Sequence, residues 1–315
     1  MEKMKRNVLL VAAGLVVLLL IAEVCLRVFF GLGSPPLVYA STKFGYAFQP
    51  NQSSTRFGHK VLYNEAGLRS EPLRPLAGMA YRVLCVGGSV TNGGAPIDQA
   101  DTYPYQLERI LNGKGQNTQV LNASAVGWTL ANENGFLQDK GIFEARVVVL
   151  EIGKRELYEG PESSSAVGTD PNLPDHRPVT AISELVGRYL LPRVLRKLGM
   201  ASEAPAWSED SMTEQNYRRG LGTLKSMVSL VSQSGAKPIL LLTPDKDESV
   251  LGRYRVDHQS DLSDLAASAN GRLIDMMPVW HTELSEGREP FRDLVDPNPE
   301  GNRLLAEAVA AGILP

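Results

Sequence analysis

Cysteine is nearly absent from this sequence, which has 315 residues and only two cysteines. Cys25 lies in an apolar N-terminal segment and Cys85 in a short apolar run, and the two cannot plausibly reach each other. A scaffold held together by disulfides is therefore excluded. Cys85 is expected to be a small residue of the core, and the two cysteines do not indicate a redox compartment.

The sequence also lacks the signatures of nucleotide, metal and nucleic-acid binding. It has no Gly-Lys-Ser/Thr loop, no G-x-G-x-x-G after its first strand and no Cys/His cluster with zinc spacing. Asn122 ends the second expected strand, where a dinucleotide-binding fold would have an acidic residue. The formal net charge is −3 and no basic stripe with interleaved aromatic residues follows the first few residues, so no nucleic-acid partner is expected. We expect no cofactor and no metal.

One long apolar segment lies at the N-terminus. It runs without a charge from Val8 to Ala22 and continues to Phe30, which is about 23 residues and enough to cross a bilayer. Glu23 and Arg27 are spaced i, i+4 and can pair or snorkel at the far interface. Positive charges precede the segment, at Lys3, Lys5 and Arg6. We predict a cytoplasmic basic tail (1–7), a transmembrane signal anchor (8–30) and a translocated remainder, with a cleaved signal peptide as the alternative.

Apolar strands alternate with helical patterns over residues 80–315. This alternation predicts βαβ units, and near-continuous Val, Ile and Leu runs indicate a parallel sheet covered on both faces. The fold class is therefore α/β, a three-layer α/β/α sandwich whose site would lie beyond the carboxyl ends of the strands. Strands are expected at 82–86, 119–122, 147–152, 238–243 and 272–275, and helices at 103–112, 130–139, 214–234, 260–269 and 300–311.

Two segments depart from this alternation. Residues 31–79 are rich in Pro, Gly, Ser and Asn, and we predict a linker with short strands that wrap the main domain. Residues 159–210 form an insertion with an expected helix at 181–198. Long insertions at the active-site edge of a compact domain are usually lids or binding loops, and a mobile surface excursion is the alternative.

A glycine-rich turn follows the first expected strand. Gly87-Gly88-Ser89 presents one hydroxyl where α/β folds place ligands and nucleophiles. The alternative is an ordinary turn or helix N-cap serine. Near the other end of the chain, the block Asp293-Leu-Val-Asp296-Pro-Asn-Pro-Glu-Gly301 precedes the last expected helix.

Together these two blocks resemble the SGNH/GDSL hydrolase family, in which a serine follows the first strand and Asp-x-x-His precedes the last helix. The resemblance implies a parallel, flavodoxin-like sheet, Ser89 as the nucleophile and Asp293 as the residue that orients its base. The stretch 121–129 is similar to a second family block, in which Gly127 corresponds to a glycine whose N–H faces the oxyanion. The stretch 64–69 resembles one that precedes the serine block in membrane-anchored bacterial members.

The sequence departs from the family pattern at four positions. Gly88 replaces the usual aspartate before the serine. In the third block, Gly153-Lys-Arg-Glu-Leu, Arg155 replaces the asparagine that donates to the oxyanion, and Glu156 replaces the next aspartate. Asp296 stands at the histidine position, and an aspartate, whose reference pKa is about 4, is a weak base towards a serine hydroxyl.

The expected site therefore has a catalytic set and a binding set. Ser89, Asp293 and Asp296 form the first, and Gly127, Arg155 and Asn122 face the oxyanion or substrate. The sequence has four histidines, at 59, 176, 258 and 281. His59 in the wrap or His176 in the insertion could be folded over the site to replace the missing base.

Two functions follow from the resemblance. The first is a serine ester hydrolase or acyl transferase acting on cell-envelope or extracellular polysaccharide, with a carbohydrate or acyl-ester substrate. The second is a catalytically inactive relative that binds glycan or a protein partner, which the sequence does not identify. Either would be a single-pass protein of the bacterial inner membrane with its main domain in the periplasm or outside the cell.

Overall fold

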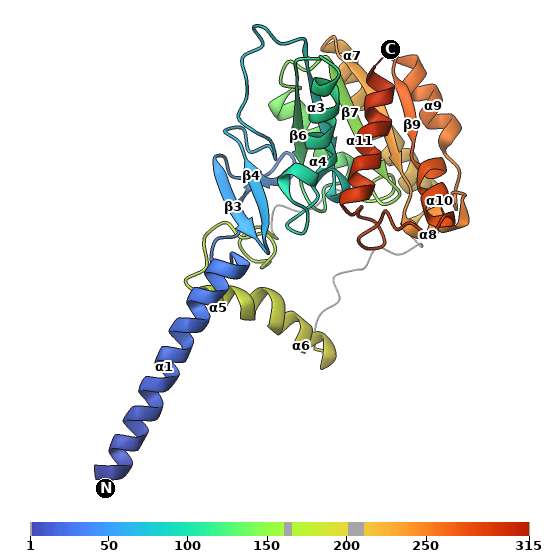
Figure 1. Cartoon of the computed structure of the whole chain (residues 1–315). Coiled ribbons are helices and arrows are strands. Elements are labelled where there is room, and N and C mark those ends of the chain that lie inside the picture. The colour runs from blue at the N-terminus through green and yellow to red at the C-terminus, as the bar shows by residue number, and fades with distance from the viewer. Residues whose placement is uncertain (1, 161–165, 201–210, 315) are drawn as a thin grey trace.

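The computed structural model describes residues 2–160, 166–200 and 211–314, and its centre is a sheet of five parallel strands (Figure 1). Helices cover both faces of this sheet, which confirms the predicted three-layer α/β/α sandwich. The strands lie in the order β6 (Thr118–Ser124), β5 (Tyr81–Gly87), β7 (Val147–Gly153), β8 (Lys237–Thr243) and β9 (Arg272–Asp275).

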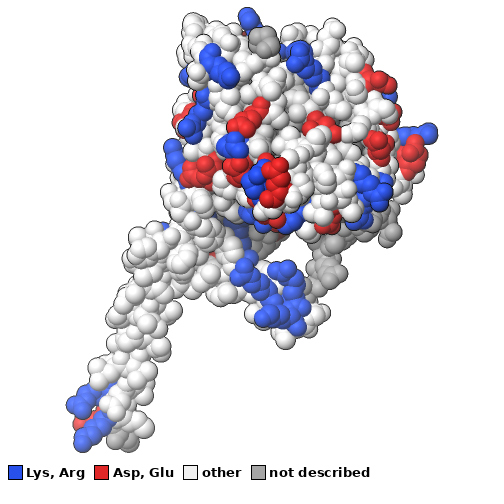
Figure 2. Space-filling model, turned by 45° about the vertical axis from the view of Figure 1, so that its right-hand side comes forward, with Lys and Arg blue, Asp and Glu red and all other residues white. Residues whose placement is uncertain are grey.

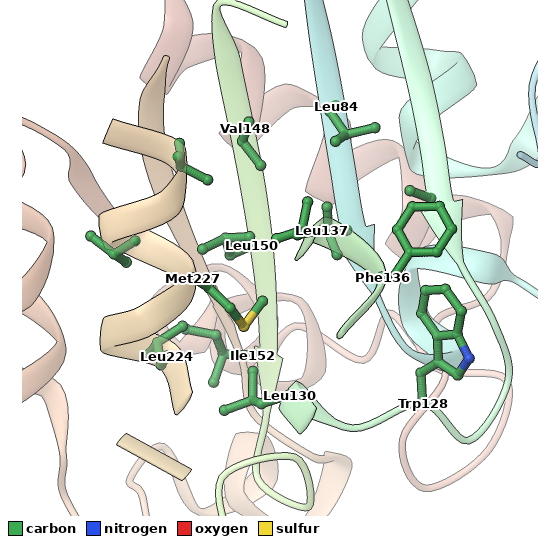
Figure 3. Packing of buried hydrophobic residues seen from close by; sticks show 14 of the residues in the cluster. Leu84, Trp128, Leu130, Phe136, Leu137, Val148, Leu150, Ile152, Leu224 and Met227 are labelled. Carbon is green, nitrogen blue, oxygen red and sulfur yellow. The ribbon is translucent and has the colours of Figure 1, made fainter. Parts of the chain in front are cut away.

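The strands are apolar on both faces because alternate residues enter two separate cores. On one face, Leu84 and Val86 of β5 lie in the same cluster as residues of α4 (Leu130–Lys140), α7 (Glu214–Gln233) and α9 (Gln259–Ser268). Figure 3 shows Leu224 and Met227 of α7 beside Leu150 and Ile152 of β7.

On the other face, Val83 and Cys85 lie against α3 (Tyr103–Gly113), α10 (Met277–Ser285) and α11 (Pro299–Ile313). Burial raises the pKa of the Cys85 thiol to about 12, in keeping with an inert core residue. All five predicted strands and all five predicted helices in this part of the chain are present. Three described α-helices in this part of the chain were not predicted: the four-residue α2 (Ser89–Asn92), α8 (Lys246–Leu251) and α10.

The parallel register brings the carboxyl ends of the strands to one edge. Gly87 is paired with Ser124 across β5 and β6, and Gly153 with Thr243 across β7 and β8. The loops that carry Ser89, Gly127 and Arg155 therefore leave the sheet side by side. This is the edge at which open α/β sheets bind ligands.

The segment before β5 is ordered by two hairpins and one buried arginine. β1 (Val38–Ser41) pairs with β2 (Gly45–Phe48), and β3 (Gln52–Arg56) pairs with β4 (His59–Tyr63), both antiparallel. Arg69 is 1% exposed and donates to the carbonyls of Asn92, Gly94 and Ile97. It thereby fastens the N-terminal wrap to the loop that follows the serine turn.

Helix α1 (Glu2–Phe30) extends away from this body as a rod of 29 residues, none of them buried (Figure 1). Among the described residues it is the one helix long and apolar enough to cross a membrane, a property that signal sequences share. Beside its C-terminal end lies the insertion helix, made of α5 (Ala181–Glu184), a π-helical turn (Leu185–Leu190) and α6 (Leu191–Lys197). Residues 161–165 and 201–210 of the predicted insertion lie outside the described residues.

Candidate functional site

Ser89 begins the short helix α2 (Ser89–Asn92) directly after β5, with Gly88 as its N-cap. The rest of this helix is buried and fixed from below: the Asn92 side-chain amide donates to the carbonyl of Ser124 at 3.0 Å. The half-buried Ser89 lines a cavity of about 460 Å³. The turn therefore presents the serine to a cavity at the carboxyl edge of the sheet, as its sequence predicts.

The C-terminal block reaches the same cavity through Asp293 and Asp296. Asp293 is half exposed, and its Oδ1 accepts hydrogen bonds from the backbone N–H groups of Val295 (3.0 Å) and Asp296 (2.8 Å). Arg292 lies between the two carboxylates, 2.6 Å from Asp296 and 3.2 Å from Asp293. Asp293 therefore shapes the turn that holds Asp296, and one arginine pairs with both.

The pKa of Asp296 decides what this carboxyl can do for Ser89. Burial raises the pKa above its usual value, while hydrogen bonding from Ser89 and the charge of Arg292 oppose the rise. Its Oδ1 is buried without a hydrogen-bond partner. Asp296 thus stands next to the serine hydroxyl, where the family has its imidazole, but it is held in an ion pair with Arg292.

Gly127, one of the residues expected to face an oxyanion, lies in a loop beside the cavity. Gly127 lines the cavity with φ = +89°, a left-handed conformation that favours glycine. The loop is held by the wrap, because Tyr46 donates to the Val126 carbonyl and Trp128 donates to the Tyr46 carbonyl at 2.8 Å. The backbone N–H groups of Ser89 and Gly127 thus belong to loops that meet at the cavity.

Two residues expected to complete this binding set are engaged elsewhere. Arg155 lines the cavity but forms a bidentate pair with Glu159, at 3.1 and 3.0 Å. Asn122 does not line the cavity. It is 1% exposed and its amide donates to the Thr91 carbonyl at 2.8 Å, behind the serine helix. A role for Asn122 in substrate binding is therefore not supported, because its side-chain amide is hydrogen-bonded to the backbone of α2.

All four histidines are described, and none of them lines the Ser89 cavity. His59 lies near the end of α1, and His176 is exposed beside Asp175. His258 stacks on Tyr217 at 3.6 Å between ring centres, and His281 meets the Ser249 carbonyl at 2.9 Å. The idea that His59 or His176 is folded over the serine is wrong for this structure.

Three carboxyls lie at or beneath the cavity, a grouping that the sequence does not indicate: Glu133 and Glu151 are buried, and the partly buried Glu156 lines the cavity. Burial raises the pKa of Glu151 to about 7, although the Thr243 hydroxyl donates to it at 2.6 Å. Burial and the neighbouring Glu151 raise the pKa of Glu156, and burial raises that of Glu133, whose two oxygens have no hydrogen-bond partner. No group of three or more His, Cys, Asp or Glu among the described residues is placed to hold a metal ion.

Gly88 and Glu156 depart from the family pattern together, and the structure connects them. A Cβ added at Gly88 would lie 2.8 Å from Glu156 Oε1 and 3.1 Å from the Trp128 carbonyl oxygen. The longer Glu156 therefore fills the space where the usual aspartate side chain would begin. Glu156 also accepts a hydrogen bond from the Gly153 N–H, so its carboxyl closes the loop that carries it.

A second cavity of about 480 Å³ adjoins the first, and both are lined by Val126, Gly127 and Asp296. Five aromatic side chains line it: Tyr46, Phe48, Phe57, Tyr63 and Tyr189. The lining also includes the amides of Asn92 and Asn172 and five charged residues, Arg56, Asp170, Arg188, Arg292 and Asp296. Aromatic rings beside a few polar groups are typical of a site for an organic ligand.

Comparison with known proteins found no matching family model and no matching curated protein. Among solved structures, the acetyl xylan esterase AlAXEase is 16% identical, with a TM-score of 0.44, over 74% of this chain and 100% of that one. A lipolytic G-D-S-L family protein from Veillonella parvula is 16% identical, with a TM-score of 0.46, over 73% and 96%. A mutant acetyl-xylooligosaccharide esterase from Geobacillus is 16% identical, with a TM-score of 0.47, over 75% and 95%.

Proposed function

We propose that this protein is a membrane-anchored binding protein for acyl-ester-bearing carbohydrate, with a hydrolase-like serine site that turns over slowly or not at all. The observation that carries the proposal is the ion pair between Asp296 and Arg292, 2.6 Å apart, at the position where an imidazole would be needed. The basic N-terminal flank and α1 support a domain on the outer face of the membrane.

Serine attack on an ester requires a base that takes the hydroxyl proton as the new C–O bond forms. A carboxylate paired with arginine is a poor proton acceptor at neutral pH. Arg155 is paired with Glu159 and does not offer a preorganised donor to the developing oxyanion. Binding without efficient turnover is therefore the function this geometry supports best.

The adjoining aromatic cavity supports a carbohydrate-bearing ligand. An acyl group at Ser89 would leave the remainder of the molecule facing Gly127, where the two cavities join. Phe57, which is 41% exposed, would contact that remainder. The protein would thus recognise the ligand at two points, with the ester bound in the first cavity and the sugar in the second.

Slow serine-dependent ester hydrolysis or acyl transfer is the second candidate. It is favoured by Asp296 Oδ1, which is buried without a partner on the carboxyl that contacts Ser89. A carboxyl with a raised pKa in this position would act as a weak base, so activity would increase with pH as Asp296 loses its proton.

The test is to restore the base in the full chain, purified in detergent. Asp296→His with Arg155→Asn should produce acetyl-ester hydrolysis at least ~100-fold above the parent, because a positioned imidazole typically contributes that much. The gain should disappear when Ser89→Ala is added. If the double mutant folds but shows no Ser89-dependent turnover, Ser89 is not a latent nucleophile. Rapid labelling of the parent by a fluorophosphonate would instead contradict slow or absent turnover.

Ligand binding is tested separately by calorimetry with acetylated and chemically deacetylated oligosaccharides. The parent should prefer the acetylated form. Phe57→Ala should weaken its affinity about two- to tenfold, the range expected for one aromatic contact. Leu76→Ala is the matched control, because Leu76 is 38% exposed and lines neither cavity. Equal affinity for both forms would refute the ester-bearing ligand.

A further inference from the structure

The insertion helix exposes an apolar face to solvent. Val186, Leu190, Val194 and Leu198 are 45%, 45%, 50% and 64% exposed, and their i, i+4 spacing places them on one side of the helix. Leu191 is 47% exposed beside them. Soluble proteins rarely expose such a stripe without a partner for it.

Positive charge accompanies this apolar face. Arg193, Arg196 and Lys197 belong to the same helix, and no acidic residue occurs from 185 to 200. Arg188, also on this helix, instead donates to Asn172 and lines the second cavity. Figure 2 shows basic side chains gathered on the segment that projects below the main body, whereas the shaft of α1 is free of charge until its N-terminal end. A helix with Leu and Val on one face and Arg and Lys around it is the composition of interfacial helices.

The insertion helix is joined to α1 at its own first turn. The Glu23 carboxylate accepts hydrogen bonds from the backbone N–H groups of Ala181 (2.8 Å) and Ile182 (3.0 Å), so α1 supplies an N-terminal cap to α5. One turn on, the buried Glu184 pairs with Arg56 and accepts from the Gly33 N–H at 2.6 Å. The insertion helix is thereby held beside the C-terminal end of α1.

The position of Glu23 sets the depth of this junction. The twenty residues from Val8 to Arg27 would cover ~30 Å, which is the thickness of the hydrocarbon core. Glu23, paired with Arg27, lies one turn before that end, so α5 would begin within about one helical turn of the far edge of the core. In Figure 1 α6 runs across the direction of α1, as a helix in the membrane plane would.

We propose that the insertion helix lies on the membrane that α1 crosses, with its apolar face in the acyl boundary of the outer leaflet and its Arg and Lys side chains on anionic headgroups. The proposal rests on the anchored topology of the proposed function and not on the ligand of the Ser89 cavity. A lipid surface is the occupant because the helix shares a level with the end of α1 and has the charge that anionic lipids attract. A second copy or another protein on this face would be a different outcome of the test.

The test uses the full chain reconstituted in vesicles of phosphatidylcholine and phosphatidylglycerol. Cys25→Ser removes the accessible native thiol, since Cys85 is buried. A single environment-sensitive fluorophore is then placed by Val194→Cys, Leu76→Cys or Val16→Cys. Leu76 precedes β5, at the opposite edge of the sheet from the Ser89 site. Phosphatidylcholine with a nitroxide on its acyl chain should quench the labels at 194 and 16 but not the label at 76.

Each result decides the proposal. Quenching at 16 but not at 194 would overturn the surface helix while leaving the anchor in place. An unquenched label at 16 would refute the anchor and the proposal together. A blue-shifted label at 194 that no lipid quencher reaches would assign the face to a protein partner. Arg193→Glu with Arg196→Glu should reduce quenching at 194, and should do so less in vesicles of phosphatidylcholine alone.

Discussion

At the scale of single residues, Gly88 and Glu156 depend on each other, because the Glu156 side chain occupies the space that a side chain at position 88 would need. Gly88→Ala should destabilise the chain by about 1–3 kcal/mol, because the new methyl group would press on Glu156 and on the Trp128 carbonyl. The measurement is chemical unfolding in detergent. Gly113→Ala is the matched control, since a Cβ there has nothing within 4 Å.

The pair can be tested further by shortening the glutamate. Adding Glu156→Asp to Gly88→Ala should recover part of the lost stability, because the shorter side chain withdraws from the new methyl group. Additive losses in the double mutant would show that the two positions are independent. This would leave the absence of the usual aspartate without a structural explanation.

Sequence reasoning found the residues that line the cavity but not their partners. Ser89, Gly127, Asp293 and Asp296 follow from motif position, because the ends of parallel strands must meet at one edge. The pairing of Arg292 with Asp296 and the burial of Glu133 depend on side-chain direction and on what packs above. Spacing in one sequence carries neither kind of information, so the aspartate at the expected histidine position was recognised and its ion pair with Arg292 was not.

At the scale of elements, α7 packs against the loop after β7 through backbone contact. A Cβ at Gly220 would overlap the Leu157 carbonyl oxygen, whereas one at Gly222, two residues on in the same helix, has nothing within 4 Å. Gly220→Ala should therefore destabilise the chain by about 1–3 kcal/mol, and Gly222→Ala should stabilise it by about 0.5–1 kcal/mol. Unfolding midpoints of the two variants give the comparison.

If both alanines stabilised the chain, the close approach of α7 to Leu157 would be contradicted.

The long elements were predictable because strands buried on both faces and amphipathic helices carry strong periodic signals. Helices α8 and α10 were missed because they have 6 and 9 residues and little amphipathic pattern. Neither of the two hairpins before β5 was located, since four- and five-residue strands in a Pro- and Gly-rich segment look like linker.

At the scale of the whole molecule, the buried carboxyls make stability depend on pH. Burial raises the pKa of Glu133 and Glu156, and that of Glu151 to about 7. Because the folded state binds these protons more tightly than the unfolded state, their burial is tolerated at low pH and becomes unfavourable as pH rises from about 4.3 towards 7 and above. The thermal midpoint should therefore fall between about pH 5 and 8.

Removing one of these carboxyls should make the thermal midpoint depend less on pH. Glu133→Met replaces a carboxyl without hydrogen-bond partners by an apolar side chain of similar length, and should stabilise the chain at pH 8 by about 1–3 kcal/mol. The gain should be smaller at pH 5. Thermal unfolding at both pH values is the measurement, and an equal gain at both would show that Glu133 is not a source of the pH dependence.

The cap that Glu23 places on α5 also determines how far the folded domain can travel. Only seven residues separate Phe30 from Val38, the first residue of β1, and even fully extended they would span about 25 Å. On the anchored topology proposed above, this short link would keep the folded domain close to the membrane. The Ser89 cavity would then sample a thin layer parallel to the bilayer, and its encounters with a ligand would become a two-dimensional search. The end of a polymer held beyond that layer would be out of reach, however well its chemistry matched the cavity.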